Sequence, residues 1–239
     1  MLRYLMLFSR QPVREAREKG LSPDAAALFG SFAAGWIRTA HREGAVPVLA
    51  TPAEDRAAWS RWLPRDSGPI LRIAQHGATF GERLAGAVRR VADLGGSVVV
   101  VGGDVLPSGE ALRNAFEALE RGDAAVVAPS SDGGVSLLGL RRDDLDLLRG
   151  MPLRSREVFG TLCAALAARG GRVCVLRRAD DVDGRRALRA LLRRETCLAT
   201  RVLLRGALAP LPEIPTAPAA PRASGHPTLP GLRAPPLAA

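Results

Sequence analysis

The stretch Ser97-Val98-Val99-Val100-Val101-Gly102-Gly103-Asp104 decides the fold. Its four consecutive valines form an apolar, β-branched run without polar alternation, which is typical of a strand buried on both faces of a sheet. Such a strand is central and parallel. The run therefore predicts an α/β domain with a mostly parallel central sheet. Ligands bind at the carboxyl ends of the strands in such sheets, and Asp104 stands at that position.

Strand-like and helical segments alternate on both sides of this run. The other predicted strands cover residues 4–8, 46–50, 70–74, 124–128, 136–140 and 173–176. Between them, apolar residues recur at helical spacing after N-terminal signals such as Ser22-Pro23, Thr79-Phe80-Gly81-Glu82, Ser108 and Ser155. The alternation predicts one doubly wound α/β domain over residues 1–195, with helices flanking the sheet.

Composition changes near residue 195. Of the 18 prolines, half lie between Pro210 and Pro236, and Ala, Gly and Leu supply much of the remainder. Such a segment offers no periodic apolar face, so residues 196–239 are predicted to be a largely disordered tail. A short helix over residues 198–204 is expected to pack on the domain.

The net charge of +10 does not indicate nucleic-acid binding. Lys19 is the only lysine, the arginines are scattered over most helical segments, and aromatic residues make up only 4%. Nucleic-acid grooves cluster basic residues and add aromatics for stacking. The apolar start, residues 1–8, is too short for a signal-peptide core or a membrane span, and the cysteines form no CxxC pair. We expect a cytoplasmic protein without nucleic-acid partners.

Three acidic positions are candidates for chemistry. Asp104 is placed to hold a magnesium ion on a diphosphate, or to tether the loop before the next helix. Asp132 opens the turn Asp132-Gly133-Gly134 between two strands, and taken alone it is best explained as a hairpin turn. Asp183 ends the run Asp180-Asp181-Val182-Asp183, where helix capping is the simpler explanation. Three carboxylates in four residues nevertheless exceed what a cap requires and favour a bound cation or nearby arginines.

Cationic and polar residues follow the first and third predicted strands. Arg10, Arg14, Arg17 and Lys19 would either grip phosphates or form an exposed basic helix face. Gln75 and Arg83 lie where they would also face the cleft.

The order of these motifs is similar to that of a bacterial family of GT-A-like transferases, once labelled rSAM/selenodomain-associated transferases. Its pattern runs F-A-K-x-P, Q-x-G-x-x-L-G-E-R-M, G-S-D-x-P, D-G-G-Y-x-L-x-G-L, P-W-S-T and D-x-D-T. The chain resembles these blocks, in the same order, at residues 8–12, 75–84, 102–104, 132–140, 152–155 and 181–183. That family is related in fold to molybdenum-cofactor and phospholactate guanylyltransferases.

The resemblance implies a GT-A-like fold, a divalent metal (magnesium or manganese), and a nucleotide-sugar or nucleotide ligand with a small-molecule acceptor. Asp104 and Asp183 would hold the metal, and Asp132 and Asp183 are the candidate catalytic residues. The expected ligand-binding residues are Arg10, Gln75, Arg83, Gly103, Gly133 and Gly134. Arg10 would replace the family's phosphate-gripping lysine, which changes a point charge to a planar fork.

Departures from the pattern leave three hypotheses. Val135 and Leu153 replace two aromatics, which predicts a changed acceptor or base pocket. The first loop lacks the family's glycine, which disfavours nucleotidyl transfer from a triphosphate and favours metal-dependent sugar transfer from a nucleotide-sugar. The same loss also motivates a third hypothesis, a catalytically inactive relative that binds a nucleotide or a partner.

Overall fold

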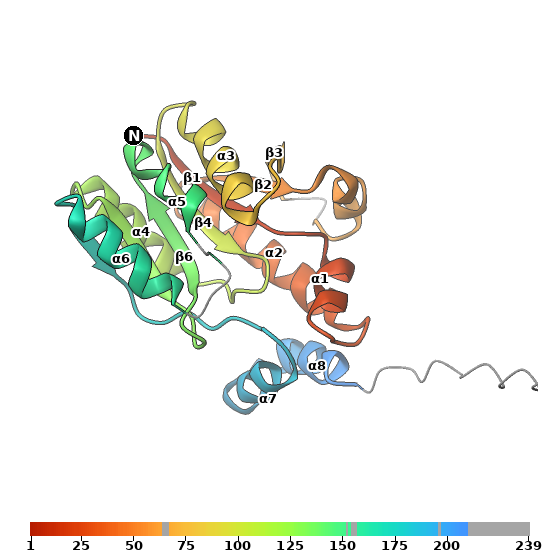
Figure 1. Cartoon of the computed structure of the whole chain (residues 1–239). Coiled ribbons are helices and arrows are strands. Elements are labelled where there is room, and N and C mark those ends of the chain that lie inside the picture. Colours follow the sequence, from red (N-terminus) through yellow and green to blue (C-terminus); the bar gives the residue numbers. More distant parts are fainter. Residues whose placement is uncertain (64–66, 152, 154–156, 196, 210–239) are drawn as a thin grey trace, which may run out of the picture.

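A computed structural model describes residues 1–63, 67–151, 153, 157–195 and 197–209, and these form a seven-stranded sheet with helices on both faces (Figure 1). The strands are β1 (Arg3–Phe8), β2 (Val46–Thr51), β3 (Leu71–Ala74), β4 (Ser97–Gly102), β5 (Ala125–Pro129), β6 (Val135–Leu140) and β7 (Val173–Val175). Their order is β3-β2-β1-β4-β6-β5-β7, with β4 in the middle. The predicted α/β class with a mostly parallel sheet is confirmed; only β6 runs antiparallel to its neighbours.

Residue alternation along the strands divides the core into two layers. The helices are α1 (Pro12–Glu18), α2 (Ala25–Arg42), α3 (Phe80–Ala92), α4 (Gly109–Glu120), α5 (Leu147–Gly150), α6 (Val158–Ala168), α7 (Arg185–Arg194) and α8 (Leu198–Ala207), with short 3-10 turns at Ala53–Asp55, Ala58–Arg61 and Arg142–Asp144. On β4, Val99 and Val101 pack with residues of α2 and α4, whereas Val98 and Val100 pack with residues of α3, α5 and α6. The valine run is thus buried on both faces, as its sequence predicts.

The C-terminal helices build a third apolar cluster. Val182, just before α7, is buried with residues of α1, α2, α7 and α8. The Ser22 hydroxyl donates to the carbonyl of Gly206 at 3.0 Å and does not cap α2, which begins at Ala25 without a side-chain cap. The helix expected over residues 198–204 is therefore present as α8 and packs on the domain. Residues 210–239 lie outside the described residues.

Two of the predicted caps are formed. The Thr79 hydroxyl accepts from the backbone N–H of Glu82 at 3.1 Å, and the Glu82 carboxylate accepts from the N–H of Thr79 at 3.2 Å, which completes a capping box. Ser108 accepts from the N–H of Ala111 at 3.2 Å. Ser155 lies outside the described residues. These caps fix the starts of α3 and α4 beside the carboxyl edge of the sheet.

Gly81 and Gly86 lie on the same helix, α3, but differ in what a methyl group would meet. A Cβ at Gly81 would lie 2.3 Å from the carbonyl oxygen of Leu148 on α5, whereas a Cβ at Gly86 would lie 3.7 Å from the carbonyl oxygen of His76. We expect Gly81→Ala to lower the free energy of unfolding by about 1 to 3 kcal/mol because α5 must shift. Gly86→Ala should raise it by up to about 1 kcal/mol through helix propensity. Urea unfolding measures both, and equal effects would contradict this packing.

Candidate functional site

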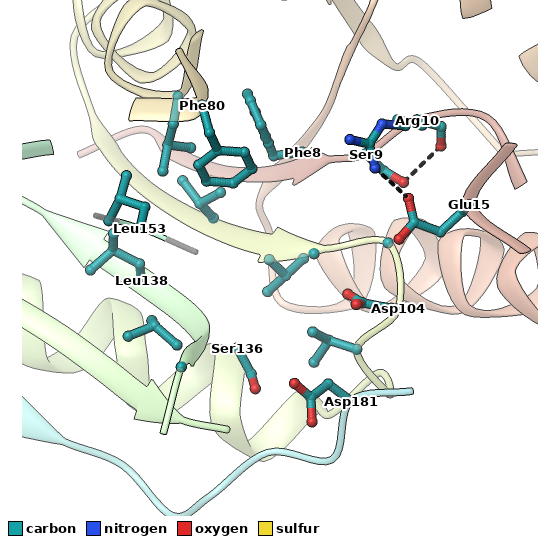
Figure 2. A pocket seen from close by; sticks show the side chains of 18 of the residues that line it. Phe8, Ser9, Arg10, Glu15, Phe80, Asp104, Ser136, Leu138, Leu153 and Asp181 are labelled. Atoms are coloured by element: carbon teal, nitrogen blue, oxygen red, sulfur yellow. Dashed lines mark hydrogen bonds and ion pairs between the residues drawn. The ribbon is translucent and has the colours of Figure 1, made fainter. Parts of the chain in front are cut away.

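A cavity of about 610 Å³ opens where the strands β1 to β4 end and β6 begins (Figure 2). Predicted site residues on its lining are Arg10, Gln75, Arg83, Gly103, Asp104, Asp132, Gly134 and Asp183. Gly133 is absent from this lining. Its φ of 92° instead lets the chain turn from β5 into β6. The carboxyl edge of the sheet therefore gathers nearly all the residues that sequence motifs had indicated.

The glycines on the lining serve packing within the protein. A Cβ at Gly103 would overlap the hydroxyl of Ser9, and a Cβ at Gly134 would lie 2.8 Å from the Ser130 hydroxyl. Both glycines thus allow neighbouring loops to approach closely. Their contact with a ligand stays a prediction.

The Asp132 turn joins two antiparallel strands, as its sequence indicates. One oxygen of the Asp132 carboxylate accepts from the N–H of Gly134 at 3.0 Å and from the Ser130 hydroxyl. The turn and the site are compatible, because these bonds orient the carboxylate at the edge of the cavity. Asp132 is therefore both a residue of the hairpin turn and a residue of the cavity lining.

The segment that leaves β7 crosses the carboxyl edge and pairs with the loop after β4. The N–H of Leu106 donates to the carbonyl of Asp180 at 2.9 Å, and the N–H of Val182 donates to the carbonyl of Asp104 at 3.0 Å. An antiparallel bridge between Val105 and Asp181 lies between these bonds. Acidic residues about eighty positions apart are thereby fixed beside one another.

Extended backbone in this segment sends alternate side chains to opposite sides. Val182 is buried in the third apolar cluster, whereas Asp181 and Asp183 line the cavity. Asp183 does not cap α7, which begins after Gly184 without a side-chain cap. The capping interpretation of Asp183 is therefore wrong. Asp180 does not line the cavity, and it pairs with Arg194 at 3.0 Å.

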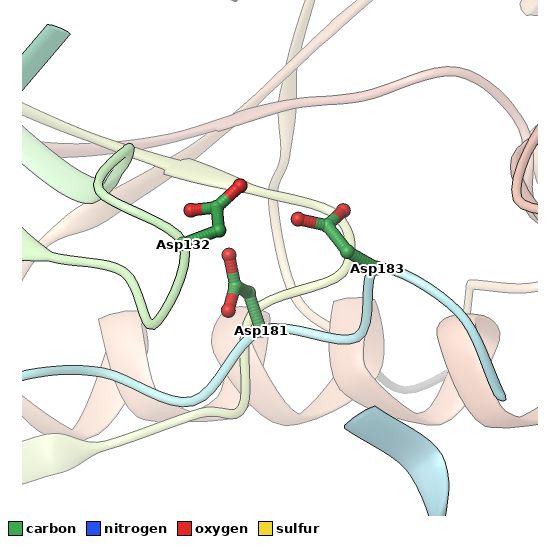
Figure 3. A group of neighbouring side chains, drawn as sticks. All are labelled: Asp132, Asp181 and Asp183. Carbon is green, nitrogen blue, oxygen red and sulfur yellow. The ribbon is translucent and has the colours of Figure 1, made fainter. Parts of the chain in front are cut away.

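Three carboxylates converge at the mouth of the cavity. Oxygens of Asp132, Asp181 and Asp183 lie within 4.8 Å of one another (Figure 3). Burial, followed by the charges of the neighbouring carboxylates, raises the pKa of the Asp181 carboxyl to about 6. Hard oxygen donors in this arrangement suit Mg²⁺ or Mn²⁺, and a cation there would remove the repulsion. The sequence motifs assigned only Asp183 to the metal and counted Asp181 among the acids of the run 180–183, although the alternation in Asp181-Val182-Asp183 places both carboxylates on one side.

Asp104 lies beside this group and is held by Lys19. The Lys19 ammonium donates to Asp104 at 2.5 Å and to Asp183, and it lies 3.6 Å from Glu15. Its side chain is only 11% exposed. Although burial disfavours the charged amine, the Asp104 and Asp183 carboxylates outweigh burial and raise the pKa of Lys19 above its ordinary value. Lys19, expected on a basic face or on phosphates, binds carboxylates in this structure.

Two of the arginines after β1, Arg10 and Arg14, are also engaged by acidic partners. Arg10 pairs with Glu18 at 2.9 Å, and Arg14 pairs with Glu54 at 2.8 Å. Arg83 differs, since it lines the cavity and has no carboxylate within 4.0 Å among the described residues; its guanidinium donates to a backbone carbonyl, that of residue 78, at 3.2 Å. The side-chain amide of Gln75 donates to a carbonyl of β2 at 2.9 Å. Arg83 is thus the cavity arginine best placed to meet an anion.

An apolar wall faces these charges. Phe8 and Phe80 meet edge to face with ring centroids 5.4 Å apart, and Leu138 and Leu153 continue the wall (Figure 2). Val135 also lines the cavity, so both positions at which the family pattern has an aromatic contribute aliphatic side chains to it. Residues 152 and 154–156 of that motif lie outside the described residues.

Fold and comparison together define a GT-A-like α/β domain whose structural neighbours are nucleotide-sugar transferases and nucleotidyltransferases. A solved structure from Desulfovibrio desulfuricans G20, described as a "putative nucleotide-diphospho-sugar transferase", is 25% identical, with a TM-score of 0.71 over 86% of this chain and 95% of that one. Residues 37–155 match the model of DUF2064, a family described as an uncharacterized protein conserved in bacteria.

More distant structures share the fold alone. Rv0371c from Mycobacterium tuberculosis H37Rv, solved in complex with manganese, is 15% identical with a TM-score of 0.51, covering 81% of this chain and 99% of that one. The 4-diphosphocytidyl-2C-methyl-D-erythritol synthase of Anaerococcus prevotii DSM 20548 is 11% identical, with a TM-score of 0.51 over 74% and 86%. No curated protein compared with the chain matches it. In the described part of the chain, no helix has the length and apolar character of a membrane span.

The raised pKa of Asp181 predicts how stability depends on pH. The folded protein binds this proton more tightly than the unfolded chain, whose carboxyl has its ordinary pKa of 3.8, so stability falls as pH rises from 3.8 to about 6. In metal-free protein at neutral pH, Asp181→Asn should raise the free energy of unfolding by about 1 to 2 kcal/mol, after allowance for partial solvent exposure. Near pH 3.8 and below, this gain should shrink.

Urea unfolding in EDTA at the two pH values measures the effect. Asp180→Asn is the matched control, because its carboxylate pairs with Arg194 outside the cavity. A gain equal for both variants, or independent of pH, would refute the assignment of repulsion to Asp181.

Proposed function

We propose that this protein transfers a sugar from a nucleotide-diphospho-sugar donor to a hydroxyl of a small-molecule acceptor, with Mg²⁺ or Mn²⁺ as cofactor. The observation that carries the proposal is the convergence of Asp132, Asp181 and Asp183 at the mouth of the cavity. The similarity to a nucleotide-diphospho-sugar transferase at 25% identity supports it.

The donor set fits a divalent cation. Asp181 and Asp183 would hold it, with Asp132 at the edge of the same site, and a cation bound there would neutralise the diphosphate that leaves when the sugar is transferred. Asp104 was predicted as a ligand beside Asp183, and Lys19 binds both carboxylates. Asp104 lies outside the group of three converging carboxylates, so we propose Asp181, which belongs to that group, as the second ligand.

Arg83 is our candidate for the donor diphosphate. A guanidinium without a carboxylate partner among the described residues can form charge-assisted hydrogen bonds to phosphate at little cost. Arg10, the residue predicted for this role, would first have to leave Glu18. The base and ribose would then lie along β1 and β3, where Gln75 lines the cavity.

Asp132 is our candidate for positioning the acceptor hydroxyl. It stands on the β5–β6 turn, next to the apolar wall that Val135 and Leu138 provide. A carboxylate at that position can accept the hydroxyl proton as the new glycosidic bond forms. Asp183, the other predicted catalytic residue, belongs to the group of three converging carboxylates, and we assign it to holding the cation.

Nucleotidyl transfer is the second candidate, since some structural neighbours are nucleotidyltransferases. It requires the protein to hold a triphosphate, which carries more negative charge than a diphosphate. Arg10 and Arg14 after β1 are already ion-paired with glutamates, which favours a diphosphate-sugar donor. The catalytically inactive relative is the third possibility.

A thermal-shift experiment separates these hypotheses. Millimolar UDP-, GDP- and CDP-sugars are compared with GTP and CTP, with and without Mn²⁺. We expect one diphosphate-sugar to raise Tm by about 5 °C only when Mn²⁺ is present. Asp181→Asn and Asp183→Asn should abolish this shift, whereas Asp180→Asn should keep it. A shift with a triphosphate alone would instead support nucleotidyl transfer, and no metal-dependent shift with any nucleotide would leave only the inactive relative.

Turnover provides a further test once a donor is identified. Asp132→Asn should lower kcat for transfer to an alcohol acceptor by about 100-fold or more, because general-base positioning is lost. KM for the donor should change far less. Release of the nucleoside diphosphate measures the rate, and Asp180→Asn is again the control. An unchanged kcat in Asp132→Asn would remove this residue from the chemistry.

A further inference from the structure

Lys19 is placed at the carboxylate cluster by features of its own segment. It follows α1 directly, and its backbone N–H donates to the carbonyl of Glu15 at 3.2 Å. Gly20, with φ of 63°, then turns the chain so that Leu21 enters the third apolar cluster. The stem of Lys19 is thereby buried and its ammonium is directed to Asp104 and Asp183.

No other cation of the described residues lies within 4.0 Å of Asp104 or Asp183. The neighbouring Arg10 and Arg14 are paired with glutamates of their own surroundings. Lys19 thus places one positive charge in a group of four acids. Two of them, Asp104 and Asp183, are bound by Lys19, and the other two are Asp132 and Asp181. Because Asp183 belongs both to this ion pair and to the three-carboxylate group, the ammonium shares a ligand with the proposed metal site.

We propose that Lys19 is a tethered cation that competes with the divalent metal for Asp183, so that metal and nucleotide-diphosphate donor bind together rather than separately. This inference rests on the proposed function. The Lys19 ammonium repels an added divalent ion and partly neutralises Asp183, the carboxylate that both would share. The metal alone therefore binds weakly. The negative charges of a diphosphate offset both cations. By linkage, the diphosphate must then tighten metal binding by the same factor as the metal tightens diphosphate binding.

Calorimetric Mn²⁺ titrations of the full chain, with and without saturating GDP or UDP, test this coupling. Lys19→Met keeps the aliphatic stem and removes the charge. We expect this variant to lower the Kd for Mn²⁺ in the absence of nucleotide by about tenfold or more. The ratio of the Mn²⁺ Kd without nucleotide to that with nucleotide should fall by a similar factor. The control is Arg17→Met, which removes the same charge from an exposed residue of α1 that does not line the cavity. It should change both quantities by less than about twofold.

Folding of each variant is checked by circular dichroism and urea unfolding. If Lys19→Met leaves the acids too repulsive to fold, the double variant Glu15→Gln with Lys19→Met keeps the charge balanced and should show the same tightening. Mn²⁺ binding that is unchanged or weaker in the folded variants would overturn the role of Lys19 and leave the proposed function standing. Absence of Mn²⁺ binding in wild type and in every variant would overturn both.

Discussion

The antiparallel pairing between residues 180–182 and the loop after β4 is the constraint on which the site depends. Two backbone hydrogen bonds and the burial of Val182 hold this crossing segment in place. Asp181 and Asp183 then face the cavity beside Asp104, and the β5–β6 turn brings Asp132 to the same place. A site held by backbone pairing and a buried valine keeps its geometry when charges within it change, as the proposed binding of a cation would require.

Charge repulsion is the cost of that arrangement. Four carboxylates lie close together, and burial, followed by the charges of the neighbouring carboxylates, raises the pKa of Asp181. Among the described residues, Lys19 balances part of this charge through Asp104 and Asp183. Stability lost at a functional site in this way is typical of proteins whose active residues are not optimised for folding.

Sequence alone could predict the sheet because each strand leaves a local signal. The valine run fixed the central strand, and capping residues such as Thr79 and Ser108 located helices correctly. The antiparallel direction of β6 left no such signal, since alternation and burial look the same in either direction. Lys19 and Asp183 lie 164 residues apart, so their ion pair could not be read from spacing. Asp181 was predicted only as one acid of the run 180–183, because the sequence does not reveal the pairing with Val105 that decides which of these acids face the cavity.

The distribution of positive charge argues for the kind of donor this cavity suits. Lys19, Arg10 and Arg14 all face acids of the protein itself, so among the described cations on the cavity lining only Arg83 is without a carboxylate partner. A triphosphate would need several of these ion pairs to open at once. A diphosphate bound through a shared metal and one arginine needs no such rearrangement. The small number of described cations without a carboxylate partner on the cavity lining thus favours the proposed diphosphate-linked donor.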